Sequence, residues 1–451
     1  MGAILEKELK KEIFSDDYEY FFSFLTDRFE YATELWIKEL EKKFNKRFKP
    51  VWIFSAKQSD LFMSKKENYI IINRKLKEIK KNLQKNNYIE LSDYEDLNKE
   101  FSESRFISGL IQDIVKKQGR VFILSFTSSF LNINNKEVVI LGPDPKIATS
   151  LDNKVEHIKL FEKLDLPRNK TKIYNNIEEI KKDANYPFYI SASYSSGGHE
   201  SKIIYQESDL DIFYLKIRDI NKSSEFIVSM LIKDIKLSPN VNAIVYGDNK
   251  TEIIFITDQI LRGNQYLGNI YPSKANEKIK EDIINVTKKV GNYMSSLGFR
   301  GIFGLDFIID LTGNLYTVDL NPRRQGGYLC NILASSKVNI IELELKLAIK
   351  EEIQIINKDS FFVNYCWAHS KIKPYYSDMQ IGESFKEGEP MDPFNQIGSK
   401  YIAIFYPKGE IFGGGCIGYY ITTGNNWDSM KQNFFEEIEK TLSKRLNMYL
   451  T

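Results

Sequence analysis

The chain has 451 residues, of which 42% are hydrophobic and 13% aromatic, and its formal net charge is +2. This length predicts two to three domains, the hydrophobic content excludes a disordered chain, and the balanced charge argues against a dedicated nucleic-acid binder. Cys330, Cys366 and Cys416 are too far apart in sequence for a CxxC pair or a disulfide framework. Because no apolar run has the length of a signal peptide or membrane span, we expect a cytoplasmic protein without membrane or nucleic-acid partners.

The first third of the sequence alternates between helical and strand patterns. Apolar residues at helical spacing predict one long amphipathic helix from Asp16 to about Phe44. Short apolar runs predict buried strands at 51–54, 69–73, 121–126 and 138–143. The Lys-rich stretch from Arg74 to Asn87 favours a solvated helix over a basic binding patch. Strands that alternate with helices indicate a small parallel sheet.

The pattern changes from Leu151 onward. A helix is predicted from Asn153 to Leu164, where Leu166-Pro167 ends it. A second amphipathic helix ends near Gly298, and a third covers 340–353. The segment from Thr171 to Asp183 fits a strand-like entry followed by a short helix. Strand patterns occupy 186–205, where a Ser/Gly loop joins two strands, as well as 226–232, 242–258 and the hairpin that begins at Gly304. After about Asn357 the sequence predicts three further strands and a terminal helix from Asn426 to about Tyr449.

Two aspartates interrupt the apolar hairpin GLDFIIDLTGNLYTVDLNPRRQGG, which begins at Gly304. A turn centred between Thr312 and Gly313, with a loop of two residues or of the four from Leu311 to Asn314, sets Asp306 opposite Asp319. Their Cβ atoms are then roughly 5 Å apart. Asn321 then lies on the same face, two residues further along. The opposite face is predicted to anchor the hairpin on a core through Leu305, Phe307, Ile309, Tyr316, Val318 and Leu320.

Facing carboxylates repel each other, and a divalent cation between them removes that cost. Magnesium prefers hard oxygen ligands, one or two carboxylates, and substrate phosphates. We therefore predict a magnesium site formed by Asp306, Asp319 and the amide oxygen of Asn321, with too few acids nearby for calcium. Arg323 follows the rigid Pro322 and can offer a planar fork of donors to a phosphate or carboxylate. The alternative, in which Asp306 is a surface residue and Asp319 a turn cap, stays open.

The segment Gly-Leu-Asp-Phe, a turn, and Tyr-Thr-Val-Asp-Leu-Asn-Pro-Arg resembles the metal-binding signature of the ATP-grasp superfamily. The resemblance covers roughly Val138 to Ile349. It implies that Lys154, in LDNK, meets the nucleotide phosphates, and that the strand FIVSMLI holds adenine. It also implies a flexible lid that binds phosphate through the backbone of Ser195, Ser196, Gly197 and Gly198.

The resemblance implies an α/β chain, α+β in parts, with three domains. These are an N-terminal pre-ATP-grasp α/β domain at 1–150, an ATP-grasp nucleotide-binding and catalytic domain at 151–355, and a small α+β domain at 356–451. The run from SPNVNAIV to GNIYP is most similar to carboxylate–amine ligases of peptide natural-product pathways, including the pheganomycin-type peptide ligases.

The sequence departs from the superfamily pattern at three positions. Ser191 stands where a phosphate-binding lysine is usual, so Lys202 or Lys216 would substitute for it, or Lys154 would serve alone. Glu200 stands where glycine is common. The second metal acid is usually glutamate, whereas this chain has the shorter Asp319. These departures leave the fold unchanged and make loss of full activity an open alternative.

The function implied by the resemblance is ATP-dependent joining of a carboxylate to an amine. ATP and Mg2+, with Mn2+ as a substitute, are the implied cofactors, and small-molecule carboxylates and amines the implied partners. Arg323 and Asn321 are the implied catalytic residues, while Arg324 or Gln325 would reach the acceptor. Two alternatives stay open, which are loading of an amino acid onto a carrier-protein thiol and a non-catalytic ATP-binding regulatory protein. A homodimer is one allowed assembly.

Overall fold

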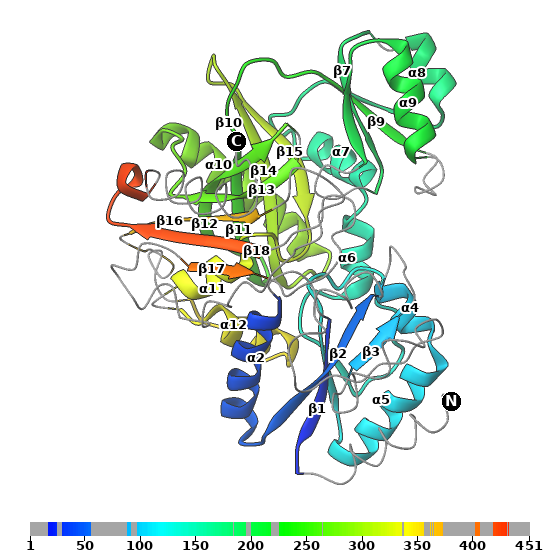
Figure 1. Cartoon of the computed structure of the whole chain (residues 1–451), viewed down its shortest axis with the longest axis vertical. Helices are drawn as coiled ribbons and strands as arrows, with labels where there is room; N and C mark the ends of the chain where they lie inside the picture. Colours follow the sequence, from blue (N-terminus) through cyan, green and yellow to red (C-terminus); the bar gives the residue numbers. More distant parts are fainter. Residues whose placement is uncertain are drawn as a thin grey trace. The chain divides into compact units, whose positions relative to one another are not determined.

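The computed structural model in Figure 1 describes most of the chain between residues 17 and 432. The described residues are 17–24, 29–55, 88–91, 97–183, 185–194, 200–217, 225–263, 265–335, 338–355, 361, 363, 365–372, 402–405, 418–430 and 432. They form two compact units. The first combines residues before 147 with most of those after 327, and the second holds 147–327 and 366–370. The expected three-domain boundaries remain a prediction.

A parallel sheet forms the centre of the first unit. Its strands, in spatial order, are β3 (Tyr88–Leu91), β2 (Phe48–Ser55), β1 (Glu19–Phe24), β4 (Val121–Leu124) and β5 (Val138–Ile140). Its helices are α2 (Phe29–Phe44), α4 (Leu97–Glu103) and α5 (Arg105–Gln118). The small parallel sheet predicted from the alternating pattern is therefore confirmed.

The predicted helix from Asp16 to Phe44 is wrong in its first half. That half contains the strand β1, and only the second half is helical, as α2. Tyr20 and Phe22 pack in the core that includes residues of α4 and α5. Phe21, pointing the other way, meets the ring of Phe48 edge-on at a centroid distance of 6.4 Å. Because helices cover both faces of the sheet, the strand is buried from Tyr20 to Phe24 and lacks the alternation that identifies a half-buried strand.

The later part of the first unit contributes two helices and a strand pair. These elements are α11 (Tyr328–Ala334), α12 (Ile340–Ala348), β17 (Ile402–Phe405) and β18 (Gly418–Gly424). Asn339 caps α12 by accepting a hydrogen bond from the backbone of Glu342, and its amide donates to Glu39 of α2 at 2.8 Å. The cap therefore also links α12 to α2.

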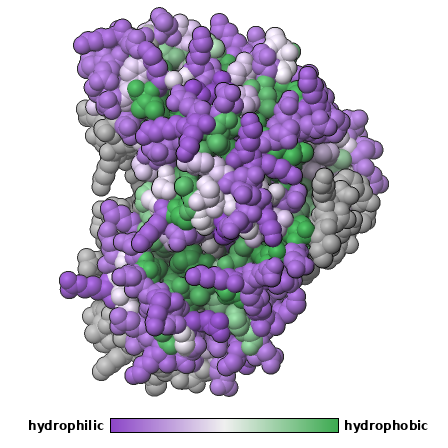
Figure 2. Space-filling model, turned by 180° about the vertical axis from the view of Figure 1, so that it is seen from behind, coloured by the Kyte–Doolittle hydropathy of each residue, from purple (hydrophilic) through white to green (hydrophobic). Residues whose placement is uncertain are grey.

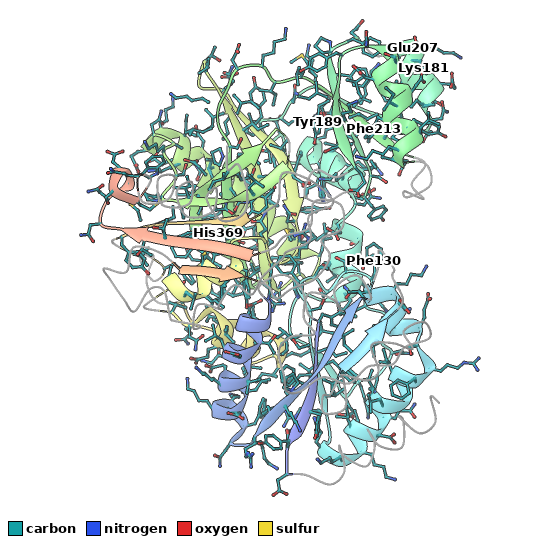
Figure 3. All side chains as sticks on the ribbon, in the orientation of Figure 1. Phe130, Lys181, Tyr189, Glu207, Phe213 and His369 are labelled. Carbon is teal, nitrogen blue, oxygen red and sulfur yellow. The ribbon has the colours of Figure 1, made fainter. Side chains whose placement is uncertain are left out.

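A small antiparallel sheet opens the second unit. Its strands, in spatial order, are β6 (Thr171–Tyr174), β9 (Phe226–Met230), β7 (Phe188–Ala192) and β8 (Ser201–Ile204). One face packs against α8 (Ile177–Asp183) and α9 (Glu207–Ile217) through a core that includes Ile190, Phe213 and Val228. Figure 3 labels Phe213 on that side and Tyr189 on β7. Tyr189 and Ser191 alternate with the core residues and lie on the other face.

A larger antiparallel sheet forms the rest of the second unit. It runs in the order β10 (Ile235–Leu237), β14 (Gly301–Asp310), β11 (Pro239–Gly247), β12 (Lys250–Arg262), β13 (Gln265–Tyr271) and β16 (Cys366–Ile372), while β15 (Leu315–Asn321) pairs with β14. One face buries Val241, Phe303 and Leu305 against α10 (Glu277–Ser296) and α7 (Lys154–Lys163). The other face carries Asn240, Asp306 and their polar neighbours, so helix packing leaves that face to the site.

Two helix boundaries follow the sequence signals closely. The side chain of Asn153 caps α7 by accepting from the backbone N–H of Val155 at 2.8 Å. After α10, Gly298 has φ +87, a conformation that glycine adopts without strain. Both predicted helices are confirmed.

Several predictions fall outside the described residues. They are the strand at 69–73, the Lys-rich helix, the loop with Ser195, Ser196, Gly197 and Gly198, Cys416, and most of the terminal helix. No helix in the described ranges is long and apolar enough to span a bilayer. Hydrophilic residues cover most of the face drawn in Figure 2, with apolar residues in smaller patches.

Candidate active site

The two acids of the β14–β15 hairpin lie opposite each other, as predicted. The register pairs Asp306 with Asp319 and Gly304 with Asn321. The turn is centred on Thr312 instead of between Thr312 and Gly313, because Ile309 lies opposite Leu315. A bulge between Asp306 and Phe307 on this ladder shifts the register by one residue and restores the predicted pairing. Val318 is the extra residue, and it is 40% exposed instead of in the core.

Neutral amides surround Asp306. Its Oδ1 accepts hydrogen bonds from the side chains of Asn240 and Gln325, the latter at 3.3 Å. Its Oδ2 accepts from Nδ2 of Asn321 at 3.3 Å. Burial and the opposite carboxylate of Asp319 raise the pKa of Asp306 to about 6, because amide donors offset these effects only in part. Asp306 thus has hydrogen-bond donors but no direct cationic partner among these contacts.

Lys154 and His157 are the partners of Asp319. The ammonium of Lys154 lies 2.6 Å from its Oδ2, and Nδ1 of His157 lies 3.1 Å from its Oδ1. Nε2 of His157 lies 2.6 Å from the carbonyl oxygen of Leu151, which can only accept, so Nε2 is the donor there. The backbone N–H of Leu320 also points at Nδ1, at 3.5 Å. His157 is 3% exposed, so the ring is fixed between these contacts.

Helix α7 carries both Lys154 and His157. The two residues are three positions apart, so they project from the same face of the helix. The resemblance implied a phosphate role for Lys154, whereas no motif singled out His157. Its three-residue spacing from Lys154 is the signal that could have identified it.

Opposing effects act on the pKa values of this ion pair. Burial favours the protonated form of Asp319, but Lys154 and His157 outweigh it and hold the pKa of the carboxyl below its usual range. Burial likewise disfavours the Lys154 ammonium, yet Asp319 raises the pKa of that group overall. The pair is therefore charged at neutral pH.

The arginines after the hairpin differ in exposure. Arg323 is partly exposed and donates to the carbonyl oxygen of Arg324 at 3.2 Å. Arg324 is 2% exposed and Gln325 6% exposed. The expectation that Arg324 or Gln325 reaches an acceptor is not favoured, because both are buried and Gln325 turns toward Asp306.

Lys202 and Ser191 lie on opposite faces of the small sheet. Lys202 pairs with Ile190, whose side chain lies in the core shared with α8 and α9, whereas Ser191 pairs with Ser201. Because residues opposite each other share a face, Lys202 emerges on the helix side and Ser191 on the other. A phosphate role for Lys202 stays a prediction that this register does not favour.

The donor set of the hairpin fits magnesium. Nowhere in the described part of the chain do three or more His, Cys, Asp or Glu side chains gather as a metal cage. Asp306, Asp319 and Asn321 instead supply two carboxylates and an amide on one face of the hairpin. Magnesium is typically held by one or two carboxylates and completes its octahedron with water and phosphate oxygens.

A family of amino-acid ligases matches this part of the sequence. Residues 167–321 match the sequence model of a family described as L-aspartate--L-methionine ligase, ATP grasp. The match contains both acids and ends at Asn321. It covers about a third of the chain.

Curated relatives share shorter stretches. The chain is 32% identical over 100 residues to the L-propargylglycine--L-glutamate ligase of Streptantibioticus cattleyicolor, covering 22% of this chain and 20% of that protein. It is 26% identical over 231 residues to the carbamoyl phosphate synthase large chain of Clostridium botulinum, covering 49% of this chain and 21% of that protein. The chain thus spans about a fifth of the length of these relatives.

Solved structures match over nearly the whole chain. The biotin carboxylase domain of the Hydrogenobacter thermophilus 2-oxoglutarate carboxylase, in complex with MgADP, ADP and bicarbonate, has a TM-score of 0.67 at 16% identity, covering 93% of this chain and 89% of that one. The carboxyaminoimidazole ribonucleotide synthase of Aspergillus clavatus, in complex with ATP, has a TM-score of 0.61 at 11% identity, covering 95% and 99%. At these identities the likeness is one of fold.

Proposed function

Since the chain has the ATP-grasp fold and sets two acids against each other within the matched stretch, we propose that it is an ATP-dependent carboxylate–amine ligase. Its cofactors would be ATP and Mg2+, with Mn2+ as a substitute. Its substrates would be amino acids or small peptides, since two of the matched relatives are named as ligases that join two amino acids. A role in natural-product biosynthesis is the finer form of this proposal.

The reaction would run in two balanced steps. A substrate carboxylate oxygen attacks the γ-phosphorus of ATP, so that ADP leaves and an acyl phosphate forms. The amine then attacks the acyl carbon, loses a proton, and displaces inorganic phosphate as the amide bond forms. Most of the protein's contribution in such a transfer is positioning and neutralisation of spread negative charge.

Each site residue has a role in this proposal. Asp306, Asp319 and Asn321 would hold magnesium, which when bound neutralises phosphate charge. Lys154 would contact the phosphates, and Arg323 would stabilise the acyl phosphate through its planar donors. The backbone of Ser195, Ser196, Gly197 and Gly198 would cover the phosphates as a lid.

The observation that supports this function most is the pairing of Asp306 with Asp319 beside Lys154. Two facing carboxylates are costly in a fold unless a cation joins them, and Lys154 alone leaves Asp306 without a direct ion pair among its contacts. The magnesium ion that binds with the nucleotide would supply the missing positive charge.

A non-catalytic nucleotide-binding protein is the second candidate. Ser191 is 6% exposed on the sheet face where a phosphate-binding lysine is usual, and a hydroxyl carries no charge for the phosphates. Nucleotide binding without turnover would follow if Lys154 cannot replace that lysine. Transfer to a carrier-protein thiol remains a variant of the ligase proposal.

A screen of amino-acid pairs for phosphate and ADP release tests the ligase proposal. We expect release that needs both a carboxylate and an amine substrate, and Asp319→Ala should abolish it while circular dichroism shows an intact fold. ADP binding without substrate-dependent release would favour the regulatory candidate. Substantial activity in Asp319→Ala would refute the metal assignment.

A further inference from the structure

We propose that Gln325 is a positioning residue for Asp306, and that residue 304 is glycine because the Gln325 side chain lies over it. This inference rests on the proposed function, since it takes Asp306 as a metal ligand. It assigns Gln325 a role beside the metal acid instead of at the acceptor.

Gln325, Asn240 and Asp306 form a closed hydrogen-bonded triangle. Nδ2 of Asn240 donates to Oδ1 of Asp306 and also to Oε1 of Gln325, the latter at 3.0 Å. Nε2 of Gln325 completes the triangle by donating to the same Oδ1 at 3.3 Å. Asn240 is 2% exposed and Gln325 6% exposed, so water is largely excluded from these contacts. The two amides therefore hold one oxygen of Asp306.

The amide of Asn240 is fixed in the orientation that the triangle needs. Its Oδ1 accepts from Nδ2 of Asn242 at 3.0 Å and from Nδ2 of Asn269 at 3.3 Å. The hydroxyl of Thr257 lies at 3.5 Å from the same atom. Turning the amide over would set Nδ2 against these donors and its oxygen against the carboxylate. Asn240 thus presents a donor to Asp306 at all times.

The chain of donors extends across the sheet to β16. The hydroxyl of Tyr266 donates its hydrogen to Oδ1 of Asn269. The same tyrosine oxygen lies 3.2 Å from Nε2 of His369 and, with its hydrogen already used, can only accept there. His369, labelled on β16 in Figure 3, is fully buried. Every donor from His369 to Asn240 points toward Asp306, and aligned hydrogen bonds strengthen one another.

Two glycines leave room for this arrangement. A Cβ on Gly304 would lie 1.9 Å from Cδ and Oε1 of Gln325, and one on Gly326 would lie 2.3 Å from the hydroxyl oxygen of Tyr266. The backbone of Gly304 is an ordinary strand conformation, so alanine is strained there only by Gln325. Because the three nearest atoms all belong to the end of the flexible Gln325 side chain, alanine at 304 would displace Gln325.

The consequence is a carboxylate with one restrained oxygen. Oδ2 contacts only Nδ2 of Asn321 among the hydrogen bonds of the described residues, at 3.3 Å, and is the oxygen that would meet a metal. Partners that orient a ligand typically change metal affinity 10–100-fold when removed. Loss of Gln325 should therefore weaken metal binding without abolishing it.

The test measures Mn2+ binding to the full chain in the presence of ADP. The electron paramagnetic resonance signal of free Mn2+ reports how much metal is bound. We expect Gln325→Ala and Gly304→Ala each to weaken Mn2+ affinity about tenfold or more, with ADP affinity in EDTA unchanged. In the Gln325→Ala background the space is vacant, so Gly304→Ala should add nothing. Gly291→Ala is the matched control, because its Cβ would lie 2.4 Å from the Thr251 side chain, away from the acids. It should lower the melting temperature and leave Mn2+ affinity unchanged.

The outcomes separate this inference from the proposed function. The inference about Gln325 would be overturned if Gln325→Ala bound Mn2+ within about twofold of the wild-type affinity while Asp306→Ala abolished binding. The metal assignment would survive that result. If wild-type protein binds no Mn2+ with ADP, the metal assignment fails as well. Gln325→Ala vacates space and crowds nothing, so it remains informative if Gly304→Ala does not fold.

Discussion

Asp306 and Asp319 occupy opposite positions of one hairpin, yet their surroundings differ in charge. Asp306 receives hydrogen bonds from three neutral amides, those of Asn240, Gln325 and Asn321. Asp319 is instead held by Lys154 and His157 from α7. The difference shows in the two carboxyl pKa values. Burial and the facing acid raise the pKa of Asp306 to about 6, whereas Lys154 and His157 lower the pKa of Asp319.

This contrast shows how the site can be stable before a metal binds and still attract one. Lys154 and His157 of α7 favour the ionised form of Asp319, while amides can orient Asp306 but cannot neutralise it. A bound metal would therefore gain most of its electrostatic attraction from Asp306, the carboxylate that lacks a direct ion pair among its contacts. Protons compete with the metal at the same carboxylate.

Removing Lys154 should have the largest effect on this contrast. Lys154→Met leaves Asp319 with His157 alone and takes a positive charge from the phosphate site, so we expect kcat to fall about 10²–10³-fold. The measurement is substrate-dependent ADP release. Lys159→Met on the same helix is the matched control, because Lys159 is 58% exposed and forms an ion pair with the exposed Glu156. Equal activity of the two variants would contradict the role of Lys154.

Acidification should act through Asp306 and leave Asp319 ionised. Below the pKa of about 6, Asp306 holds a proton that the metal must displace. Mn2+ affinity in the presence of ADP should therefore fall by up to about tenfold per pH unit on acidification from about pH 6 to pH 5. A flat affinity profile across this range would show that Asp306 is not the acid that competes for protons.

The same shift predicts how stability depends on pH without metal. The folded pKa of Asp306 lies above the unfolded value of about 3.9, so between these values the folded state binds more protons than the unfolded state. The contribution of Asp306 to stability is therefore fully present below about pH 4 and is lost as the pH rises through about 6. Mg2+ with ADP should restore it, which thermal unfolding at several pH values can check.

Local patterns were enough to predict the elements that carry the site. The buried positions Leu305, Phe307 and Ile309 at a spacing of two identify one face of β14, and Asn153 marks the start of α7 as its cap. The facing of Asp306 and Asp319 is confirmed, although the turn is centred on Thr312 and would by itself shift the pairing by one residue. The bulge, which no local pattern indicated, compensates for that shift.

The partners of the acids could not be predicted, because they come from distant strands and helices. Asn240 reaches Asp306 only because β11 pairs with β14, and nothing in the local sequence around Asn240 specifies that pairing. His157 depends on how α7 packs against β15. The strand β1 was mistaken for helix because Tyr20, Phe21 and Phe22 are buried on both faces, which removes the period-two signal.

The smallest effect is expected at the bulge that aligns the two acids. Val318 is 40% exposed, so Val318→Thr should change the free energy of unfolding by less than about 0.5 kcal/mol and leave Mn2+ affinity unchanged. Replacement of Ile309, which is 1% exposed, by threonine should lower the free energy of unfolding by about 2–4 kcal/mol. Ile309→Thr removes buried hydrocarbon and places a hydroxyl in the core. Chemical denaturation of both variants gives the two values. If Val318→Thr weakened Mn2+ binding, the alignment of Asp319 with Asp306 would depend on packing of the valine and not on the extra residue of the bulge.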